Sequence, residues 1–355
     1  MRHFQSRPAS EFHFQEILYQ KDGRVATVTI NRPRYYNCVT TLTLEELTAA
    51  FQDIADDDAI GVAVLTAAGE RAFCTGADVR EYAGNYISRP RDYWKYIGRF
   101  RAFLESILHN GKPTIARLNG MAAGGGNETQ LACDLTVMAE HAYIKHVGTR
   151  VGNVAAAGGT QWLPIVVGDK RAREILFLNR PIPSRQALEW GLVNQVTPSV
   201  KKDGEFITGA SPEQIDKAIE NAEGYSISLE LLDRAVAELI DGLLESFPEC
   251  TRYTKEQTNF LKDLVWNSTI GHAREWLALH FVGIEPFEGM NAFAEKRPAN
   301  YAMVRDRWAN DDSPEYVWGA YVRECAKCGA KSLPARFMHC GNCGAALKPD
   351  SADGK

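Results

Sequence analysis

Short apolar runs alternate with amphipathic segments through the first 200 residues, and this alternation leaves few folds open. Apolar runs at 24–30 and 61–66 flank a segment whose apolar side chains, from Leu44 to Ile54, recur every three or four residues. The order then repeats, with helices expected at 93–108 and near 128 and strands at 113–118 and 135–138. Strands that alternate with helices predict an α/β class with crossover connections.

Local signals place the ends of several elements. An Asp-Gly turn at 22–23 between two alternating runs predicts a hairpin of 14–19 with 24–30. Thr43, with Glu46 three residues later, predicts a capping box at the start of the first helix. The alternation stops near Pro198. We expect a polar connection over 200–210 and helices from Ser211 onward.

Composition excludes several classes of protein. The 355 residues are 45% apolar, which excludes a disordered chain, and the net charge of −5 excludes the basic field of a nucleic-acid binder. The longest apolar stretch, 59–69, is far shorter than the roughly 18 residues of a membrane span. The first residues lack the apolar run of a signal peptide. We therefore expect a cytoplasmic protein without nucleic-acid or membrane partners.

Two small-residue segments are candidates for the chemistry. Residues 71–79 form a turn after a buried strand, and residues 119–128 contain three consecutive glycines, Gly124 to Gly126, at the start of a helix. Such glycines leave backbone N–H groups unshielded at the positive end of the helix dipole. That environment suits an anion or a developing oxyanion. A phosphate-binding loop is disfavoured, because no Gly-Lys-Ser or Gly-x-Gly-x-x-Gly motif follows.

Together these segments resemble the crotonase (enoyl-CoA hydratase/isomerase) superfamily from about Phe14 to Tyr301. Five motifs occur in the family's order: Asn31-Arg32-Pro33-Arg34, residues 72–78, Gly124-Gly125-Gly126-Asn127-Glu128, Gly158-Gly159-Thr160-Gln161 and residues 288–297. The resemblance implies a spiral of ββα turns, assembled as a homotrimer or a dimer of trimers, and a coenzyme A thioester as substrate.

The resemblance also implies roles for particular residues. The amides of Ala77 and Gly125 would form an oxyanion hole for the thioester carbonyl, and Glu128 would be a catalytic carboxylate. Contacts with coenzyme A are predicted for Arg34, Ala72, Asp78, Phe293 and Lys296, where Phe293 and Lys296 would reach the coenzyme A of a neighbouring subunit.

One carboxylate of the simple hydratases is missing. The position of their second glutamate falls on Gly148, which leaves space rather than a proton donor, and this suits a bulkier or cyclic acyl group, or an ordered water or anion. His146, Lys145 and Tyr82 are candidates for the general acid by neighbourhood. Family members with glycine here include dihydroxynaphthoyl-CoA synthases and the ring-opening hydrolases of alicyclic acyl-CoA compounds.

Further features favour the hydrolases. Residues 201–207 form an insertion relative to small crotonases, and the stretches 228–236, 246–250 and 273–279 resemble the hydrolases that act on 6-oxocyclohex-1-ene-1-carbonyl-CoA. Gln161 departs from them, since a carboxylate is expected there. We therefore expect an alicyclic acyl-CoA hydratase or hydrolase. The alternatives are enoyl-CoA hydration, ring closure of the dihydroxynaphthoyl-CoA synthase type, and a scaffold without activity.

The C-terminal segment carries a different signal. Its four cysteines form two C-x-x-C pairs, each followed by glycine and separated by eleven residues: Cys325, Cys328, Cys340 and Cys343. Four thiolates at this spacing predict a tetrahedral metal site and resemble a zinc ribbon, with iron as the rival metal. The predicted organisation is thus a crotonase spiral at 12–200, a helical trimerisation region at 201–308, a linker near 310–314 and the ribbon at 323–348.

Overall fold

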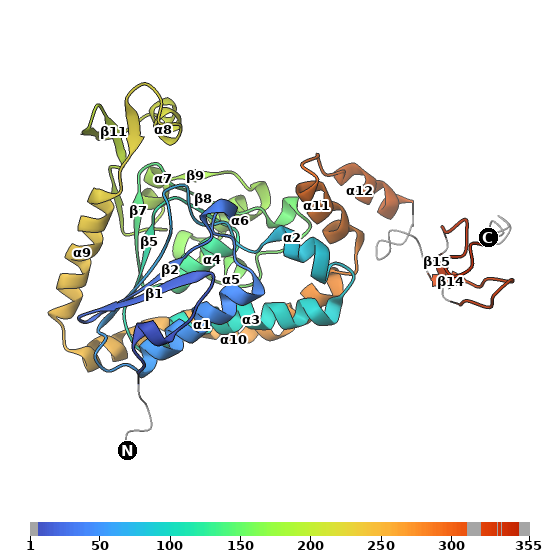
Figure 1. Cartoon of the computed structure of the whole chain (residues 1–355), viewed down its shortest axis with the longest axis horizontal. Coiled ribbons are helices and arrows are strands. Elements are labelled where there is room, and N and C mark those ends of the chain that lie inside the picture. Colours follow the sequence, from blue (N-terminus) through green and yellow to red (C-terminus); the bar gives the residue numbers. More distant parts are fainter. Residues whose placement is uncertain (1–5, 311–320, 332, 335, 348–355) are drawn as a thin grey trace, which may run out of the picture.

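The computed structural model describes residues 6–310, 321–331, 333–334 and 336–347 (Figure 1). Most of the predicted linker, residues 311–314, lies outside the described residues, as do the first five residues and Lys348. Within the described part, no helix is both long and apolar enough to cross a membrane.

The predicted α/β class is confirmed. The helices are α1 (Thr41–Asp56), α2 (Val79–Glu81), α3 (Pro90–Leu108), α4 (Gly125–Ala132), α5 (Gly159–Val167), α6 (Asp169–Leu178), α7 (Ser184–Glu189), α8 (Pro212–Ile219), α9 (Glu230–Leu244), α10 (Pro248–His280), α11 (Ile284–Ala294) and α12 (Tyr301–Ala309). Shorter helical turns are η1 (Ala9–Glu11), η2 (Pro33–Tyr35), η3 (Tyr82–Tyr86) and η4 (Gly148–Arg150).

The strands belong to four sheets. They are β1 (Ile17–Asp22), β2 (Val25–Ile30), β3 (Val62–Ala67), β4 (Ala72–Cys74), β5 (Thr114–Leu118), β6 (Met121–Ala123), β7 (Leu135–Ala139), β8 (Tyr143–Lys145), β9 (Ile182–Pro183), β10 (Gln195–Thr197), β11 (Val200–Lys202), β12 (Glu205–Ile207), β13 (Tyr225–Ile227), β14 (Tyr321–Arg323) and β15 (Leu333–Pro334). The two main sheets have the orders β1-β2-β3-β5-β7-β10 and β4-β6-β8-β9.

Consecutive strands alternate between these two sheets, which is the ββα spiral that the family resemblance implied. The pairs β3–β4, β5–β6 and β7–β8 each place their first strand in the six-stranded sheet and their second in the four-stranded one. Apart from the hairpin β1–β2, the six-stranded sheet is parallel. Every residue of β3 is buried, as expected for a parallel strand covered on both faces.

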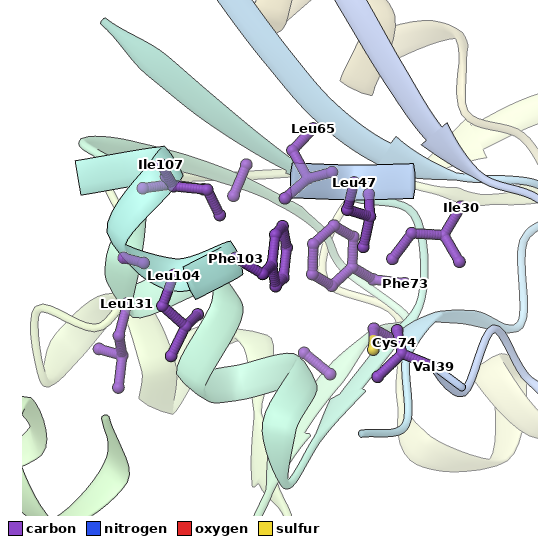
Figure 2. Packing of buried hydrophobic residues seen from close by; sticks show 14 of the residues in the cluster. Ile30, Val39, Leu47, Leu65, Phe73, Cys74, Phe103, Leu104, Ile107 and Leu131 are labelled. Atoms are coloured by element: carbon purple, nitrogen blue, oxygen red, sulfur yellow. The ribbon is translucent and has the colours of Figure 1, made fainter. Parts of the chain in front are cut away.

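The core between the large sheet and the helices α1 and α3 is apolar (Figure 2). Phe51 of α1 and Phe103 of α3 lie with ring centroids 6.3 Å apart, and Phe73 of β4 packs beside them. The long helix α10 is tied to this core through a buried lysine. The Lys255 ammonium contacts Asp134 at 2.9 Å and also donates to the carbonyl oxygens of Ile107 and Lys112.

Two local predictions are wrong. The first helix is capped by Thr40, with Thr43 completing the capping box, because Thr40 is extended and its side chain reaches the Thr43 amide. The Glu46 carboxylate instead accepts the backbone N–H groups of Gln15 and Glu16.

The other error concerns residues 200–227. They form the antiparallel sheet β12-β11-β13 rather than a polar connection followed only by helices. With α8, this sheet encloses a small core of its own around Val200, Ala210 and Ala218.

Candidate active site

The two glycine-rich segments meet because strands β4 and β6 are parallel neighbours in the small sheet. Each strand leads directly into a turn, so Gly76 and Gly125 come into contact. A Cβ on Gly76, whose φ is +82°, would lie 2.7 Å from the Gly125 nitrogen. A Cβ on Gly126 would overlap the carbonyl oxygen of Cys74. Glycine is therefore required for the two backbones to approach this closely.

The approach leaves two backbone N–H groups for a ligand. Gly125 is the first residue of α4, so its N–H lies outside the hydrogen-bond ladder of the helix. The Ala77 N–H has no acceptor among the described residues, although its neighbours Gly76 and Asp78 both bond to Val39. Ala77 and Gly125 both line the same cavity. The arrangement has the form of an oxyanion hole.

Glu128, on the first turn of α4, contributes the carboxylate of this cavity. Its Oε1 accepts the backbone N–H groups of Gly159 at 3.0 Å and Ala157 at 3.2 Å, at the start of α5. Burial raises the pKa of Glu128 to about 7, and the two amide donors oppose this rise only in part. A carboxyl group with such a pKa can both accept and return a proton near neutral pH.

The cavity is partly open and largely apolar. Three tyrosines of η3 and α3, Tyr82, Tyr93 and Tyr96, line one side together with Phe100. Burial raises the pKa of Tyr82 well above its usual value, so its phenol stays protonated. Among the lining residues Glu128 is the one carboxylate.

Of the candidates for the general acid, His146 and Tyr82 line the cavity and Lys145 does not. The Nε2 atom of His146 lies 2.8 Å from the Asn127 side-chain amide nitrogen, and its buried Nδ1 atom has no partner among the described residues. Burial lowers the pKa of His146 to about 4, so the ring is neutral at physiological pH.

Gly148 and Gln161, which occupy the positions of two expected carboxylates, have different surroundings. Gly148 lines the cavity, and a Cβ there would lie 3.0 Å from the Asn153 carbonyl oxygen. Gln161 lies outside the cavity and holds the start of α5. Its Oε1 accepts the Gly158 N–H at 3.1 Å, and its Nε2 donates to the Ala156 carbonyl at 2.8 Å. Gln161 therefore fixes the turn that presents the Ala157 and Gly159 amides to Glu128.

The residues predicted to contact coenzyme A are in two kinds of environment. Arg34, Phe293 and Lys296 are exposed. The Ala72 carbonyl accepts the Asn37 side-chain amide at 2.7 Å.

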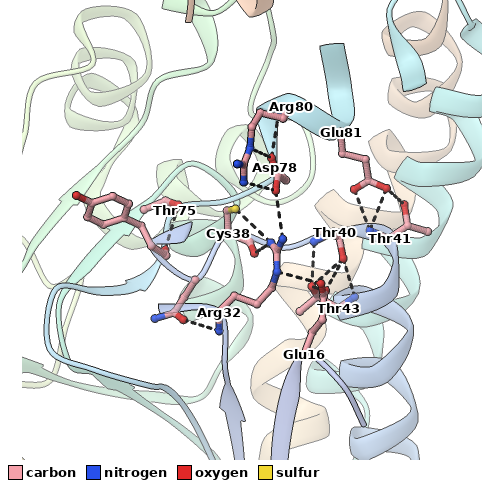
Figure 3. A network of polar contacts seen from close by, with 12 residues as sticks. Glu16, Arg32, Cys38, Thr40, Thr41, Thr43, Thr75, Asp78, Arg80 and Glu81 are labelled. Atoms are coloured by element: carbon pink, nitrogen blue, oxygen red, sulfur yellow. Dashed lines mark hydrogen bonds and ion pairs between the residues drawn. The ribbon is translucent and has the colours of Figure 1, made fainter. Parts of the chain in front are cut away.

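The Asp78 carboxylate lies between Arg32, at 3.3 Å, and Arg80, at 3.2 Å (Figure 3). Although burial opposes it, hydrogen bonds from Arg80 and Arg32 hold the pKa of Asp78 below its usual value. Ala72 and Asp78 thus already support the turn that carries Ala77.

The four C-terminal cysteines form a second candidate site. Their sulfur atoms all lie within 4.8 Å of one another, with Cys325 and Cys343 at 3.7 Å and Cys328 and Cys340 at 3.7 Å. These separations exclude disulfides, whose sulfurs lie about 2.05 Å apart. Gly329 and Gly344, each with φ of +69°, follow the two C-x-x-C pairs and close equivalent turns.

Sequence reasoning missed the Ala157 and Gly159 amides that hold Glu128, and it missed Tyr93 and Tyr96. A usable signal for the amides was the run of small residues 155–159 before a helix, which resembles the run before α4. The tyrosines give no such signal, because their spacing in α3 also fits an ordinary buried helix face.

Comparison with known proteins agrees with this geometry. The sequence profile of the enoyl-CoA hydratase/isomerase family matches residues 20–219, which is more than half of the chain. The chain belongs to this family, also called the crotonase family, as its motifs indicated. It is therefore an enzyme of the crotonase class of acyl-CoA hydratases and hydrolases.

Two curated relatives, from Geobacter metallireducens and Thauera aromatica, are both named 6-oxocyclohex-1-ene-1-carbonyl-CoA hydrolase. Each is 32% identical to this chain, over 77% and 76% of its length and over 78% and 76% of their own. The structure of an enoyl-CoA hydratase from Bacillus anthracis matches with a TM-score of 0.58 and 30% identity, covering 81% of this chain and 99% of its own. An enoyl-CoA hydratase from Mycobacterium avium subsp. paratuberculosis K-10 matches with a TM-score of 0.65, covering 81% and 98%. At 23% identity it supports the fold alone.

Proposed function

We propose that this protein hydrates and then opens the ring of an alicyclic oxo-enoyl-CoA thioester. The observation that carries the proposal is one buried carboxylate with a pKa near 7, in the same apolar cavity as two unused backbone amides. The names of the two curated relatives support the substrate class.

In the proposed hydration, the thioester carbonyl oxygen binds the N–H groups of Ala77 and Gly125. Glu128 takes a proton from water, and the water oxygen adds to the β-carbon of the double bond. The electron pair of that bond moves onto the thioester as an enolate, whose oxygen the two amides stabilise. Glu128 then returns the proton to the α-carbon, so one water adds across the double bond.

Ring opening uses the same groups on a ketone next to the α-carbon. Glu128 takes a proton from a second water, whose oxygen attacks the ketone carbon. The bond between the ketone carbon and the α-carbon then breaks, and its electron pair forms the thioester enolate again. The ketone carbon becomes a carboxylic acid, and Glu128 returns the proton to the α-carbon. Both steps need one base and one oxyanion hole.

The test is mass spectrometry of the products from crotonyl-CoA, cyclohex-1-ene-1-carbonyl-CoA and 6-oxocyclohex-1-ene-1-carbonyl-CoA. We expect two waters to be added to the oxo compound. A single added water would identify a hydratase that does not cleave the ring. No change on any of the three compounds would overturn the proposal in favour of another acyl class or a scaffold.

We also propose how coenzyme A is held. The exposed cations Arg34 and Lys296 would contact its phosphates, and the exposed ring of Phe293 would contact its adenine or pantetheine part. Phe293 and Lys296 would act on a neighbouring subunit of a trimer. Ala72 and Asp78 would contribute through the backbone turn that they support.

For the four cysteines we propose a structural zinc ion. Four sulfurs about 2.3 Å from one ion at tetrahedral angles lie roughly 3.8 Å apart, and two of the observed pairs are separated by 3.7 Å. Four thiolates leave no open position for a reacting water. The metal would replace a hydrophobic core, since the apolar cluster in the described part of this segment has three buried members, Cys325, Cys340 and Leu347.

A further inference from the structure

A chain of buried polar side chains leads from the core to His146. The Thr136 hydroxyl donates to Gln130 Oε1 at 2.9 Å, and Gln130 Nε2 donates to Asn127 Oδ1 at 2.8 Å. Asn127 Nδ2 then lies 2.8 Å from His146 Nε2. Because every link donates in the same direction, Nε2 is an acceptor. A neutral ring must then carry its proton on Nδ1.

This Nδ1–H group is both unused and close to the catalytic carboxylate. His146 is 1% exposed, lines the cavity, and has no partner for Nδ1 in the described structure. A Cβ on Gly159 would lie 3.0 Å from His146 Cε1 and 3.2 Å from Glu128 Oε1. The imidazole and the carboxylate therefore both approach Gly159, and His146 and Glu128 both line the cavity. A buried donor without a partner costs stability unless a ligand completes it.

Resting on the proposed function, we infer that His146 is a second oxyanion donor, which binds the ring ketone of the substrate through Nδ1–H. Attack of water on that ketone places negative charge on its oxygen, while the Ala77 and Gly125 amides hold the thioester oxygen. Two oxyanions form on one substrate, so two separate donor sites are needed. The neutral imidazole donates without losing its proton, and hence does not compete with Glu128 as the base.

The polar chain makes Asn127 and Gln130 positioning residues for His146. Their contacts fix which ring nitrogen of His146 carries the proton. The Asn127 side-chain oxygen accepts from Gln130, so the Asn127 amide nitrogen faces His146 Nε2 as a donor. If the chain donated in the opposite direction, Nε2 would carry the proton and Nδ1 would be an acceptor. That arrangement would repel the ketone oxygen and contradict the inference.

The test compares two variants of the full-length protein on two substrates. His146→Gln removes a donor from the Nδ1 position, whereas His146→Asn places an amide nitrogen close to it. The substrates are 6-oxocyclohex-1-ene-1-carbonyl-CoA and cyclohex-1-ene-1-carbonyl-CoA, which lacks the ketone. In His146→Gln we expect kcat for ring opening to fall about 100-fold or more relative to kcat for hydration of the ketone-free compound. His146→Asn should recover much of that ratio.

Equal losses on both substrates in folded His146→Gln would overturn the inference while leaving the proposed function in place. Failure of the wild-type protein to open the ring would instead overturn the proposed function, and with it the role of His146. Long-range ¹H–¹⁵N NMR of the wild-type protein, assigned by comparison with His146→Asn, gives a test without activity. We expect Nδ1 to be protonated at pH 7. A proton on Nε2 would refute the inference even if His146→Gln does not fold.

Discussion

The cavity around Glu128 and the cluster of four cysteines place their functional atoms in different ways. Ala77, Gly125 and Gly159 are far apart in the sequence, and they meet only because a large apolar core fixes the strands and helices before them. The four cysteines lie within 19 residues, and three buried residues form the core of the described part of their segment. The first site is therefore formed by the fold itself, whereas the second, on the proposed zinc assignment, would need its metal in order to fold.

Removing the carboxylate should have the largest effect. We expect Glu128→Gln to lower kcat on the preferred acyl-CoA by about 1,000-fold or more, since one group both takes and returns the proton. The amide oxygen can still accept from Gly159 and Ala157, so the fold should remain. Glu140→Gln is the matched control, because Glu140 is equally buried but pairs with Arg185 outside the cavity. Steady-state kinetics of both variants provide the test. A Glu128→Gln enzyme with wild-type turnover would refute the role of Glu128 as the base.

Adding a side chain where the two glycine-rich segments are in close contact should have the next largest effect. Gly126→Ala forces a methyl group onto the Cys74 carbonyl oxygen, and such overpacking costs about 1–3 kcal/mol. Gly242→Ala in α9 adds the same methyl group to open space and should instead stabilise by about 0.5–1 kcal/mol. Urea unfolding of the two variants measures the difference. Equal changes would mean that the close approach does not constrain the site.

Catalytic rate and stability should depend on pH in opposite directions. Because Glu128 acts as a base and its pKa is about 7, kcat should fall about tenfold per pH unit below 7 and level off above it. The folded-state pKa lies above the ordinary value of 4.5, so the unfolded chain loses this proton first as pH rises. The contribution of Glu128 to stability is therefore lost between about pH 4.5 and 7.

Comparing the wild-type protein with Glu128→Gln tests the direction in which kcat and the free energy of unfolding each change with pH. The variant should lack the acidic limb of the rate profile in any residual activity. It should also gain stability relative to the wild type between pH 5 and pH 8. A rate profile with the same acidic limb in the variant would assign that limb to another group.

Loss of the proposed metal should have the smallest effect of these changes on the stability of the main core. Cys328→Ser should reduce bound zinc, measured by mass spectrometry of the metal, from one ion per chain to a small fraction. The free energy of unfolding of the crotonase core should change by less than about 1 kcal/mol, since the cysteines and the main core belong to separate clusters. Cys250→Ser, at an exposed cysteine of α10, is the control. A red protein with the spectrum of iron bound to four sulfurs would identify the rival metal.

Several parts of the fold and the site could be predicted because they depend on neighbours in sequence. The hairpin β1–β2 is predicted from the turn signal around Gly23, although the turn residues are Gly23 and Arg24, and α4 is predicted from the glycines at its start. The errors arose where contacts distant in sequence decide the outcome. Glu46 is three residues from Thr43, yet it binds the amides of Gln15 and Glu16 in the preceding segment. Strand β11 lies between β12 and β13, and its pairing with β13, which follows α8, is a contact distant in sequence.

The sequence by itself determined the family, the position of Glu128 after three glycines, and the four-cysteine set, because each is a short pattern with its own chemistry. Only the tertiary structure decided the electrostatics of the site. Burial raises the pKa of Glu128 and lowers that of His146, and burial depends on the packing of α3, α4 and α5 around the cavity. The free proton of His146 likewise depends on Thr136 of β7 and on Gln130 and Asn127 of α4. The hydrogen bonds that join α4 to Thr136 and to His146 form only after the tertiary structure has brought these residues together.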